Sequence, residues 1–276
     1  MRRLFFVVVA VGLALAACGV EDDTSGNEGA AAPRCDTSDP PTQEGGVLTV
    51  ATDKPAFPPW FEGSPKHYSG YEGELATEIA ERMNLDITWV VEPFNKSYAP
   101  GEKDYDFDIN QISITPEREQ AVDFSDGYFT NNQGVLAMEG SPITEATTVE
   151  DLADFQLGSQ VGTTGLDFIN EVVQPSSQPR IFDTTNDAKS ALESGQIDAL
   201  VTDVVTTVYL RDFEINGSEV IGQYPSQEQF GMLFEQGNQL RICVNEVLAD
   251  IKSDGTLEDL QQEWLQQYLS VPTLEE

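Results

Sequence analysis

Residues 113–128 read Ser-Ile-Thr-Pro-Glu-Arg-Glu-Gln-Ala-Val-Asp-Phe-Ser-Asp-Gly-Tyr. This stretch begins where a predicted strand ends. The residues before them, from Phe107 to Ile112, predict a short strand, and Pro116 can begin a helix because its fixed φ suits the first helical position. The stretch therefore predicts the end of a strand, a polar loop and the start of a helix.

The same order of strand, loop and helix recurs on both sides of this stretch. Because strands that alternate with helices are typical of sheets with helical crossovers, the sequence predicts an α/β fold. Its 276 residues suffice for two domains. The predicted strands are Val47 to Ala51, Asp86 to Val91, Gln133 to Met138, Phe155 to Gln160 and Ile197 to Thr202, and the predicted helices are Glu74 to Met83, Thr163 to Val173, Asn186 to Ser194 and a segment from Leu240.

Polar residues follow several of these predicted strands, where open α/β sheets bind ligands. Asp53, Arg118, the run Gly162-Thr163-Thr164 and Asp203 occupy such positions. A guanidinium matches a carboxylate, helix amides add donors, and an Asp can face an ammonium, so the set suits a zwitterion. Each residue alone has a simpler interpretation, since Arg often lies on the surface and Asp often caps a helix.

The whole chain resembles a family, and five motifs in family order carry the resemblance. They are residues 70–76 (Gly-Tyr-Glu-Gly-Glu-Leu-Ala), the stretch 113–128, Gly162-Thr163-Thr164, residues 195–199 (Gly-Gln-Ile-Asp-Ala) with Asp203, and residues 252–257 (Lys-Ser-Asp-Gly-Thr-Leu). Over roughly Gly46 to Leu269 the sequence resembles the family 3 extracellular solute-binding proteins of polar amino acid ABC importers. Gly73 departs from the pattern, which usually has an aliphatic residue there.

The resemblance implies a two-lobed periplasmic binding protein type II fold, with mixed sheets, flanking helices and a two-strand hinge near Tyr128 to Gln133 and Ser226 to Gly231. Lobe 1 would comprise residues 46–130 and 229–276, and lobe 2 would comprise residues 131–228. It further implies that closure of the lobes on a free amino acid presents a form that the permease subunits recognise, with the protein acting as a monomer.

The resemblance also assigns roles in the site. The Arg that matches Arg118 grips the ligand carboxylate with the main-chain amide at Thr164. The positions that match Asp203, Ser113 and Gln111 hold the ammonium. As an exposed arginine in a cleft, Arg118 is expected to add little to stability.

The ligand side chain would lie between aromatic residues that match Phe57 and Phe94, with Asp53 near its far end. The loop before Phe57 is one residue longer than usual, and Trp60 is expected in the core. An additional carboxylate at Asp53 favours a polar or basic side chain. The alternative is that Asp53 only caps its own loop.

The N-terminus has the order of an export signal, with Arg2-Arg3, an apolar run and small residues. Leu15-Ala16-Ala17-Cys18 resembles the lipobox of bacterial lipoproteins, which implies a signal peptide over residues 1–18 and acylation of Cys18. A plain secretory peptide with an incidental Cys is the alternative. Residues 19–44 are poor in large apolar side chains and are expected to form a flexible tether.

Two further cysteines, Cys35 and Cys243, remain in a chain expected to work outside the reducing cytoplasm. A disulfide is the expected pairing. The alternative is two free thiols, with Cys243 in a helix core.

Composition argues against several other functions. The chain has 14 basic and 48 acidic residues, a net charge of -34, which repels nucleic acid. Its single histidine, His67, provides neither a metal cluster nor a Ser-His-Asp arrangement, so no metal, cofactor or catalytic residue is expected. Two alternatives share the fold: an enzyme like cyclohexadienyl dehydratase, and a sensory module, which would need a membrane span and signalling domain that the sequence up to Glu276 does not add.

Overall fold

The computed structural model describes residues 35–36 and 39–275. The predicted signal peptide, Cys18 and most of the predicted tether lie outside these residues. At the end of the tether, Gln43 donates hydrogen bonds to Asp106 and to the Tyr105 carbonyl. Over the described part of the chain, every helix is too short or too polar to cross a membrane.

The first sheet has five strands in the order β4-β1-β5-β12-β6. Strand β1 (Val47–Thr52) is parallel to β4 (Asp86–Val91) and to β5 (Phe107–Asp108). Strand β12 (Leu233–Glu235) returns to this sheet from late in the sequence and runs antiparallel to β5 and β6 (Val122–Phe124). A separate hairpin pairs β2 (Glu62–Ser64) with β3 (His67–Ser69).

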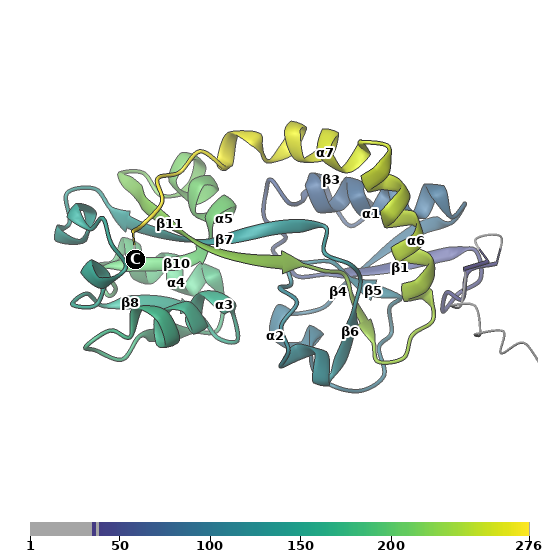
Figure 1. Cartoon of the computed structure of the whole chain (residues 1–276), viewed down its shortest axis with the longest axis horizontal. Coiled ribbons are helices and arrows are strands. Elements are labelled where there is room, and N and C mark those ends of the chain that lie inside the picture. Colours follow the sequence, from purple (N-terminus) through teal and green to yellow (C-terminus); the bar gives the residue numbers. More distant parts are fainter. Residues whose placement is uncertain (1–34, 37–38, 276) are drawn as a thin grey trace, which may run out of the picture. The chain divides into compact units, whose positions relative to one another are not determined.

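The second sheet also has five strands, in the order β11-β7-β10-β8-β9. Strands β8 (Leu157–Gln160), β9 (Arg180–Phe182) and β10 (Ala199–Asp203) are parallel, and β10 is antiparallel to β7 (Phe129–Met138). Strand β11 (Ser218–Phe230) pairs with β7 from Phe230 to Ser218, and this long ribbon extends from the second sheet toward the first (Figure 1). The predicted mixed α/β fold is therefore confirmed.

Helices cover the sheets, and some of their bounds differ from those predicted. Helix α1 (Tyr71–Arg82) begins before Glu74, because the carbonyls of Pro59 and Trp60 accept its first amides. The helix predicted from Pro116 is only one 3-10 turn, Arg118–Gln120. The remaining α-helices are α2 (Phe94–Ser97), α3 (Thr164–Asp167) continued by a π-helical segment (Phe168–Val173), α4 (Thr185–Glu193), α5 (Val204–Tyr209) continued by a π-helical segment (Leu210–Glu214), α6 (Leu240–Ser253) and α7 (Thr256–Trp264).

An aromatic cluster forms the centre of the first core. Trp60 is fully buried, as predicted, and its ring makes edge contacts with Tyr71, Phe129 and Phe230. These rings bring the start of α1 together with the ends of β7 and β11. The aromatic cluster therefore fixes the place where β7 and β11, which belong to the second sheet, reach the first core.

Gly73, the departure from the family pattern, has a packing reason in this structure. A Cβ at Gly73 would lie 3.1 to 3.3 Å from atoms of Tyr68. The Tyr68 ring makes edge contacts with Phe61 and Trp89, so it has little room to move. A larger residue at position 73 would therefore have to displace the β2-β3 hairpin.

The disulfide between Cys35 and Cys243 is present, with a Cα–Cα distance of 4.7 Å. Cys243 belongs to α6 and is 2% exposed. The predicted pairing is therefore confirmed, and it fastens residue 35 to the helices that cover the first sheet.

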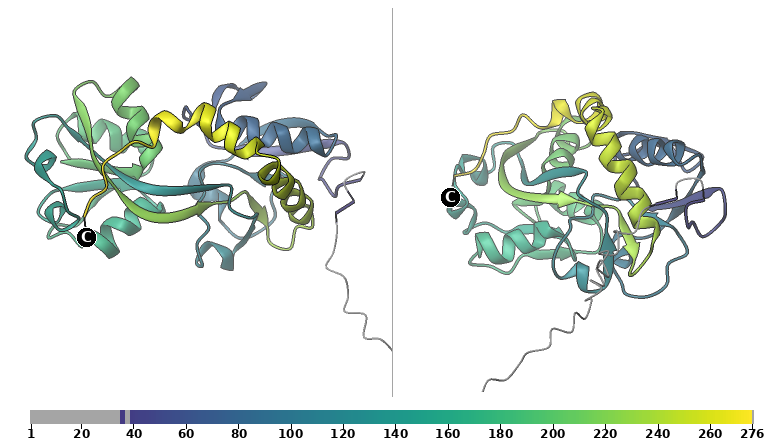
Figure 2. Two further views of the ribbon diagram at one scale, coloured as in Figure 1. Left: turned by 45° about the horizontal axis from the view of Figure 1, so that its top comes forward. Right: turned by 45° about the vertical axis from the view of Figure 1, so that its right-hand side comes forward.

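The C-terminal tail connects the two cores. After α7 the chain crosses from the helices of the first sheet to the second sheet (Figures 1 and 2). There Leu274 is buried in the cluster that includes Leu157 and Phe168, and its amide donates to the Gln223 carbonyl. The Glu275 amide donates to Thr147, and the Glu275 carbonyl accepts from the Val149 amide. The tail is thus a third connection beside β7 and β11.

We expect Leu274→Ala to lower the free energy of unfolding by about 2 kcal/mol, because it removes buried methyl groups from a packed cluster. Thr273→Ala, at an exposed position of the same tail, is the matched control and should change it by less than about 0.5 kcal/mol. Urea unfolding of both variants measures the difference. Equal midpoints would mean that the tail does not contribute to stability.

Candidate functional site

One cavity is lined by residues from both sheets. All nine residues predicted from the sequence lie around it: Asp53, Phe57, Phe94, Gln111, Ser113, Arg118, Thr163, Thr164 and Asp203. Residues near β1, β5 and α2 come from the first sheet, and residues near β8 and β10 come from the second. The ends of strands that are far apart in the sequence therefore meet at one place.

Arg118 is buried, with 7% of its surface exposed, which corrects the expectation of an exposed arginine. Its guanidinium donates to the carbonyl of Ser113 at 2.7 Å and to the carbonyl of Gly162 at 2.9 Å. The rings of Phe94 and Tyr98 lie 5.5 and 5.0 Å from its central carbon. Burial lowers the pKa of Arg118, but the group stays charged because its ordinary value is so high. The guanidinium therefore links the loop after β5 to the loop after β8.

Glycine is required at position 162, whose carbonyl accepts a hydrogen bond from Arg118. Its φ is +70°, and a Cβ there would lie 2.1 Å from the Tyr98 hydroxyl. Both the backbone conformation and the close approach exclude a larger side chain. Gly162 therefore lets Tyr98 and Arg118 reach the loop that precedes α3.

Thr163 and Thr164 have different roles at the start of α3. The Thr163 hydroxyl accepts from the Leu166 amide and donates to the Gln160 carbonyl, so it caps the helix. The Thr164 hydroxyl instead joins a polar cluster beside the cavity. Since the first amides of a helix have no partner within the helix, the Thr164 main chain can also donate to an anion.

A carboxylate that the sequence analysis did not single out connects this polar cluster. Glu228, on β11, accepts from the hydroxyls of Ser113 and Thr164 at 2.7 and 2.6 Å. Its other oxygen accepts from the Gln133 amide at 2.9 Å. Glu228 thus joins the loop after β5 with α3 and β7.

Asp203 lies at the end of β10, at the N-cap position of α5, but its side chain does not cap the helix. One carboxylate oxygen accepts from the Asn131 amide at 2.7 Å. Burial, and then the charge of Glu228, raise the pKa of Asp203 to about 8. The helix-capping interpretation therefore fails for Asp203, which faces the cavity with a carboxyl that readily takes up a proton.

Glu72 is fully buried behind Gln111. Its carboxylate accepts from the Gln111 main-chain amide at 2.8 Å, from the Gln111 side chain and from the Tyr128 hydroxyl. Gln111 has a φ of +49°, and this arrangement holds its side-chain amide back. The side-chain nitrogen of Gln111 is bound to Glu72, so the side-chain carbonyl oxygen is the group that can accept a hydrogen bond from a ligand.

Burial raises the pKa of Glu72 to about 7, although hydrogen bonds from Tyr128 and Gln111 oppose the shift. The folded protein therefore retains a proton that the unfolded chain, with a carboxyl pKa near 4.3, releases. This contribution to stability is complete below about pH 4 and is lost as the pH rises through about 7.

We therefore expect the free energy of unfolding to fall between pH 5 and pH 8, and Glu72→Gln to remove on the order of 2 kcal/mol of that fall. Urea titrations in about 1 M salt, which screens surface charge, measure it. Glu81→Gln, at an exposed position of the same helix, is the control and should keep the full pH dependence. An unchanged slope in Glu72→Gln would contradict the assignment.

Asp53 is more constrained than the sequence suggested. One oxygen accepts from the amide of Lys54, and the other accepts from the amide of Phe94 at 3.2 Å. Asp53 therefore caps its own loop, as the alternative interpretation held, and it also fixes Phe94 while lining the cavity. Phe57 lines the cavity as well, despite the longer loop before it.

Several residues of the site could not be found from sequence patterns. Tyr98, Gln133 and Glu228 follow no recognisable motif, and each reaches the site through a contact distant in sequence. Asn110 has a buried amide nitrogen without a partner, and Gln133 and Asn131 have buried side-chain oxygens without one. Such atoms are uncommon in folded proteins, because a buried polar group without a partner costs free energy.

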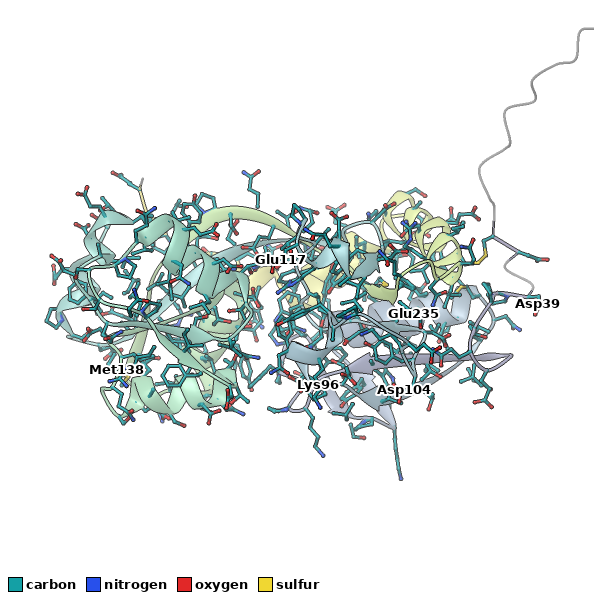
Figure 3. The ribbon with its side chains drawn as sticks, turned by 90° about the horizontal axis from the view of Figure 1, so that it is seen from below. Asp39, Lys96, Asp104, Glu117, Met138 and Glu235 are labelled. Atoms are coloured by element: carbon teal, nitrogen blue, oxygen red, sulfur yellow. A yellow bond between two sulfur atoms is a disulfide. The ribbon has the colours of Figure 1, made fainter. Side chains whose placement is uncertain are left out.

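Acidic residues lie both on the outside of the molecule and around the cavity. Asp39, Asp104 and Glu117 represent the many acidic residues on the outside (Figure 3). Around the cavity, Asp53 and Asp203 accompany a single cation, Arg118, and Glu228 and Glu72 lie directly behind. Among residues 35–36 and 39–275, no group of three or more His, Cys, Asp or Glu could hold a metal.

Residues 48–267 match the model of the bacterial extracellular solute-binding proteins, family 3. The chain belongs to this family. The match spans both sheets and includes every residue that lines the cavity.

Among curated proteins, the chain is 28% identical over 225 residues to the L-cystine-binding protein TcyJ of Escherichia coli K12, covering 80% of this chain and 84% of that protein. It is 30% identical over 207 residues to the glutamine-binding protein GlnH of Bacillus subtilis 168, covering 72% and 73%.

The chain is also similar to solved structures of amino acid-binding proteins. An ancestral arginine-binding protein bound to glutamine has a TM-score of 0.71 and 28% identity, covering 80% of this chain and 98% of that chain. An ancestral amino acid-binding protein described as a precursor of cyclohexadienyl dehydratase has a TM-score of 0.69 and 28% identity, covering 79% and 95%. The structural neighbours are amino acid-binding proteins of the type II periplasmic fold.

Proposed function

We propose that this protein captures a free L-amino acid with a polar or basic side chain and delivers it to the permease of an ABC importer. The observation that carries the proposal is the pair of groups that line one cavity, the guanidinium of Arg118 and the carboxyl of Asp203. A free amino acid carries a carboxylate, which matches the guanidinium, and an ammonium, which favours the charged form of the Asp203 carboxyl. The family and its amino acid-binding members support the same function.

In the proposed complex, Arg118 and the Thr164 amide bind the carboxylate. Asp203, Ser113 and the Gln111 carbonyl bind the ammonium, while Phe57 and Phe94 flank the side chain. The ligand would touch residues of both sheets, which we propose act as two lobes. The first is formed by residues 46–130 with 229–271 and the second by residues 131–228, and the expected place of the tail in the first lobe is corrected because residues 272–275 pack on the second core. A ligand that completes contacts from both lobes favours the closed state, because only that state offers all of them.

A lipid anchor at Cys18 is part of the same proposal. It rests on the lipobox sequence Leu15-Ala16-Ala17-Cys18, which precedes the described residues. Acylation would keep the binding protein, as a monomer, at the outer face of the membrane that contains its permease. Mass spectrometry of the protein extracted from membranes would detect the acylated Cys18, and a soluble product that begins at another residue would contradict the anchor.

A thermal-shift screen tests the proposed function. The panel contains the twenty common amino acids together with L-cystine and ornithine. A ligand that binds only the native state raises the melting temperature. At a free ligand concentration of about 1,000 times Kd, binding adds about 4 kcal/mol to the free energy of unfolding. Calorimetry then gives the affinity of each positive compound. Absence of binding to every amino acid would overturn the proposal.

The side-chain preference has its own prediction. We expect Asp53→Asn to weaken binding of arginine or lysine by about tenfold while changing glutamine by less than about threefold, because a screened carboxylate in a cleft contributes about 1 kcal/mol to a cation. Competition calorimetry measures the ratio. Equal losses for all ligands would mean that Asp53 acts only by holding Phe94.

A second candidate is an enzyme of the cyclohexadienyl dehydratase kind. Two observations favour it: a structural neighbour described as a precursor of that enzyme, and a cavity carboxyl, Asp203, that holds a proton near neutral pH. Such a carboxyl could act as a general acid. Incubation with arogenate, followed by assay for phenylalanine, separates the two functions, and turnover would favour the enzyme.

A further inference from the structure

We propose that Glu228 is a positioning residue that turns the hydrogen-bonding groups beside the cavity into acceptors, and so makes this wall specific for the ammonium of the ligand. The inference rests on the proposed function and extends it to a residue outside the cavity lining. Its basis is the direction of three hydrogen bonds that converge on one carboxylate.

A carboxylate can only accept hydrogen bonds, whereas a hydroxyl has one proton and two lone pairs. Because the hydroxyls of Ser113 and Thr164 both donate to Glu228, neither has a proton left for a group in the cavity. What they offer to a ligand is lone pairs. Without Glu228, the same hydroxyls could rotate and donate to a carboxylate instead.

Gln133 is oriented in the same way. Its amide nitrogen donates to Glu228 at 2.9 Å and to the Thr164 hydroxyl at 3.1 Å, which uses both of its protons. A flipped amide would place an oxygen against the carboxylate of Glu228, which is repulsive. The Gln133 oxygen is consequently buried without a partner, and Gln133 lines the cavity.

Asn131 continues the pattern on the neighbouring part of β7. Its amide nitrogen donates to Asp203, and its oxygen is buried without a partner. Together with Asp203, the cavity-lining groups of Ser113, Thr164 and Gln133 form a set of acceptors, while Arg118 supplies donors to the same cavity. An ammonium, which has protons and no lone pair, matches the acceptors, and a carboxylate does not.

The test compares the purified wild-type protein with Glu228→Gln. The substituted amide keeps the size of Glu228 but brings two protons, so the hydroxyls or Gln133 must reorient. Probes are L-arginine, L-glutamine, L-histidine and L-cystine, each paired with the same molecule lacking its α-amino groups. Glu219→Gln, on the same strand, is the control for the loss of one negative charge.

We expect Glu228→Gln to weaken binding of the amino acid by about 10- to 100-fold, as for loss of a hydrogen bond to a charged group. Binding of the deaminated partner should change by less than about threefold, so the preference for the ammonium collapses. Glu219→Gln should retain it. Glu228→Asp, which still only accepts, should retain a larger preference than Glu228→Gln and covers the case in which Glu228→Gln does not fold.

The outcomes separate this inference from the proposed function. If the wild-type protein binds an amino acid and Glu228→Gln weakens both members of a pair equally, Glu228 is merely structural and the inference is overturned alone. If the wild-type protein binds none of the probes nor any other amino acid of the screen, the proposed function fails and the inference fails with it. Collapse of the preference in Glu228→Gln but not in Glu219→Gln supports both.

Discussion

Arg118→Ala is expected to weaken amino acid binding by more than about 1,000-fold, because it removes a bidentate, charge-assisted contact worth about 4 kcal/mol. The guanidinium also holds the carbonyls of Ser113 and Gly162 and packs against Phe94 and Tyr98. The variant should therefore also be less stable, by about 1 to 3 kcal/mol. Calorimetry and urea unfolding measure the two effects.

Two variants keep these effects apart. Arg118→Lys retains the charge but loses the planar fork, so we expect an intermediate affinity and a smaller loss of stability. Arg180→Ala, at an exposed position, should bind as the wild type does. If Arg118→Ala is folded at the assay temperature and binds with unchanged affinity, Arg118 is not the carboxylate site.

Affinity is expected to rise about tenfold per pH unit between pH 6 and pH 8 and then to level off, because the free protein holds a proton on Asp203 below about pH 8. An ammonium favours the charged carboxylate, so binding must release that proton. Affinity falls at lower pH because the pKa of Asp203 is raised, so removing its proton costs more free energy as the pH falls further below that pKa. Calorimetry in buffers of different ionisation enthalpy counts the protons released.

Asp203→Asn should abolish this pH dependence and weaken binding at pH 8 by about 100-fold, since the charged partner of the ammonium is gone. Asp154→Asn, an exposed control, should retain both affinity and slope. Retention of the full pH dependence in Asp203→Asn would assign the proton to another group of the cavity.

Local sequence patterns determined much of the fold. Strand β4 has the predicted bounds, Asp86–Val91, because its run of apolar residues specifies a strand locally. Strand β11 was predicted only near its C-terminal end. It contains Gly222 and Pro225, which usually mark loops, and it is extended because it pairs with β7 over most of its length.

The residues of the cavity also fall into two groups, those that local sequence signals predict and those that only the folded structure identifies. The nine predicted residues follow strand ends or match family motifs, and both signals are local in sequence. Tyr98, Gln133 and Glu228 have no such signal, since their importance comes from partners that the fold brings near. Ser113 and Glu228 are 115 residues apart in the sequence, yet their side chains are 2.7 Å apart.

The sequence by itself therefore determined the α/β class, the family and nine of the residues that surround the cavity. Only the tertiary structure decided that Arg118 is buried against the rings of Phe94 and Tyr98, that Asp53 is bound to its own loop, and that Glu228 accepts from the neighbouring hydroxyls. The physical reason is that hydrogen-bond direction and burial depend on neighbours in space. Residue identity fixes which donors and acceptors exist, and the packed fold fixes which of them remain free for a ligand.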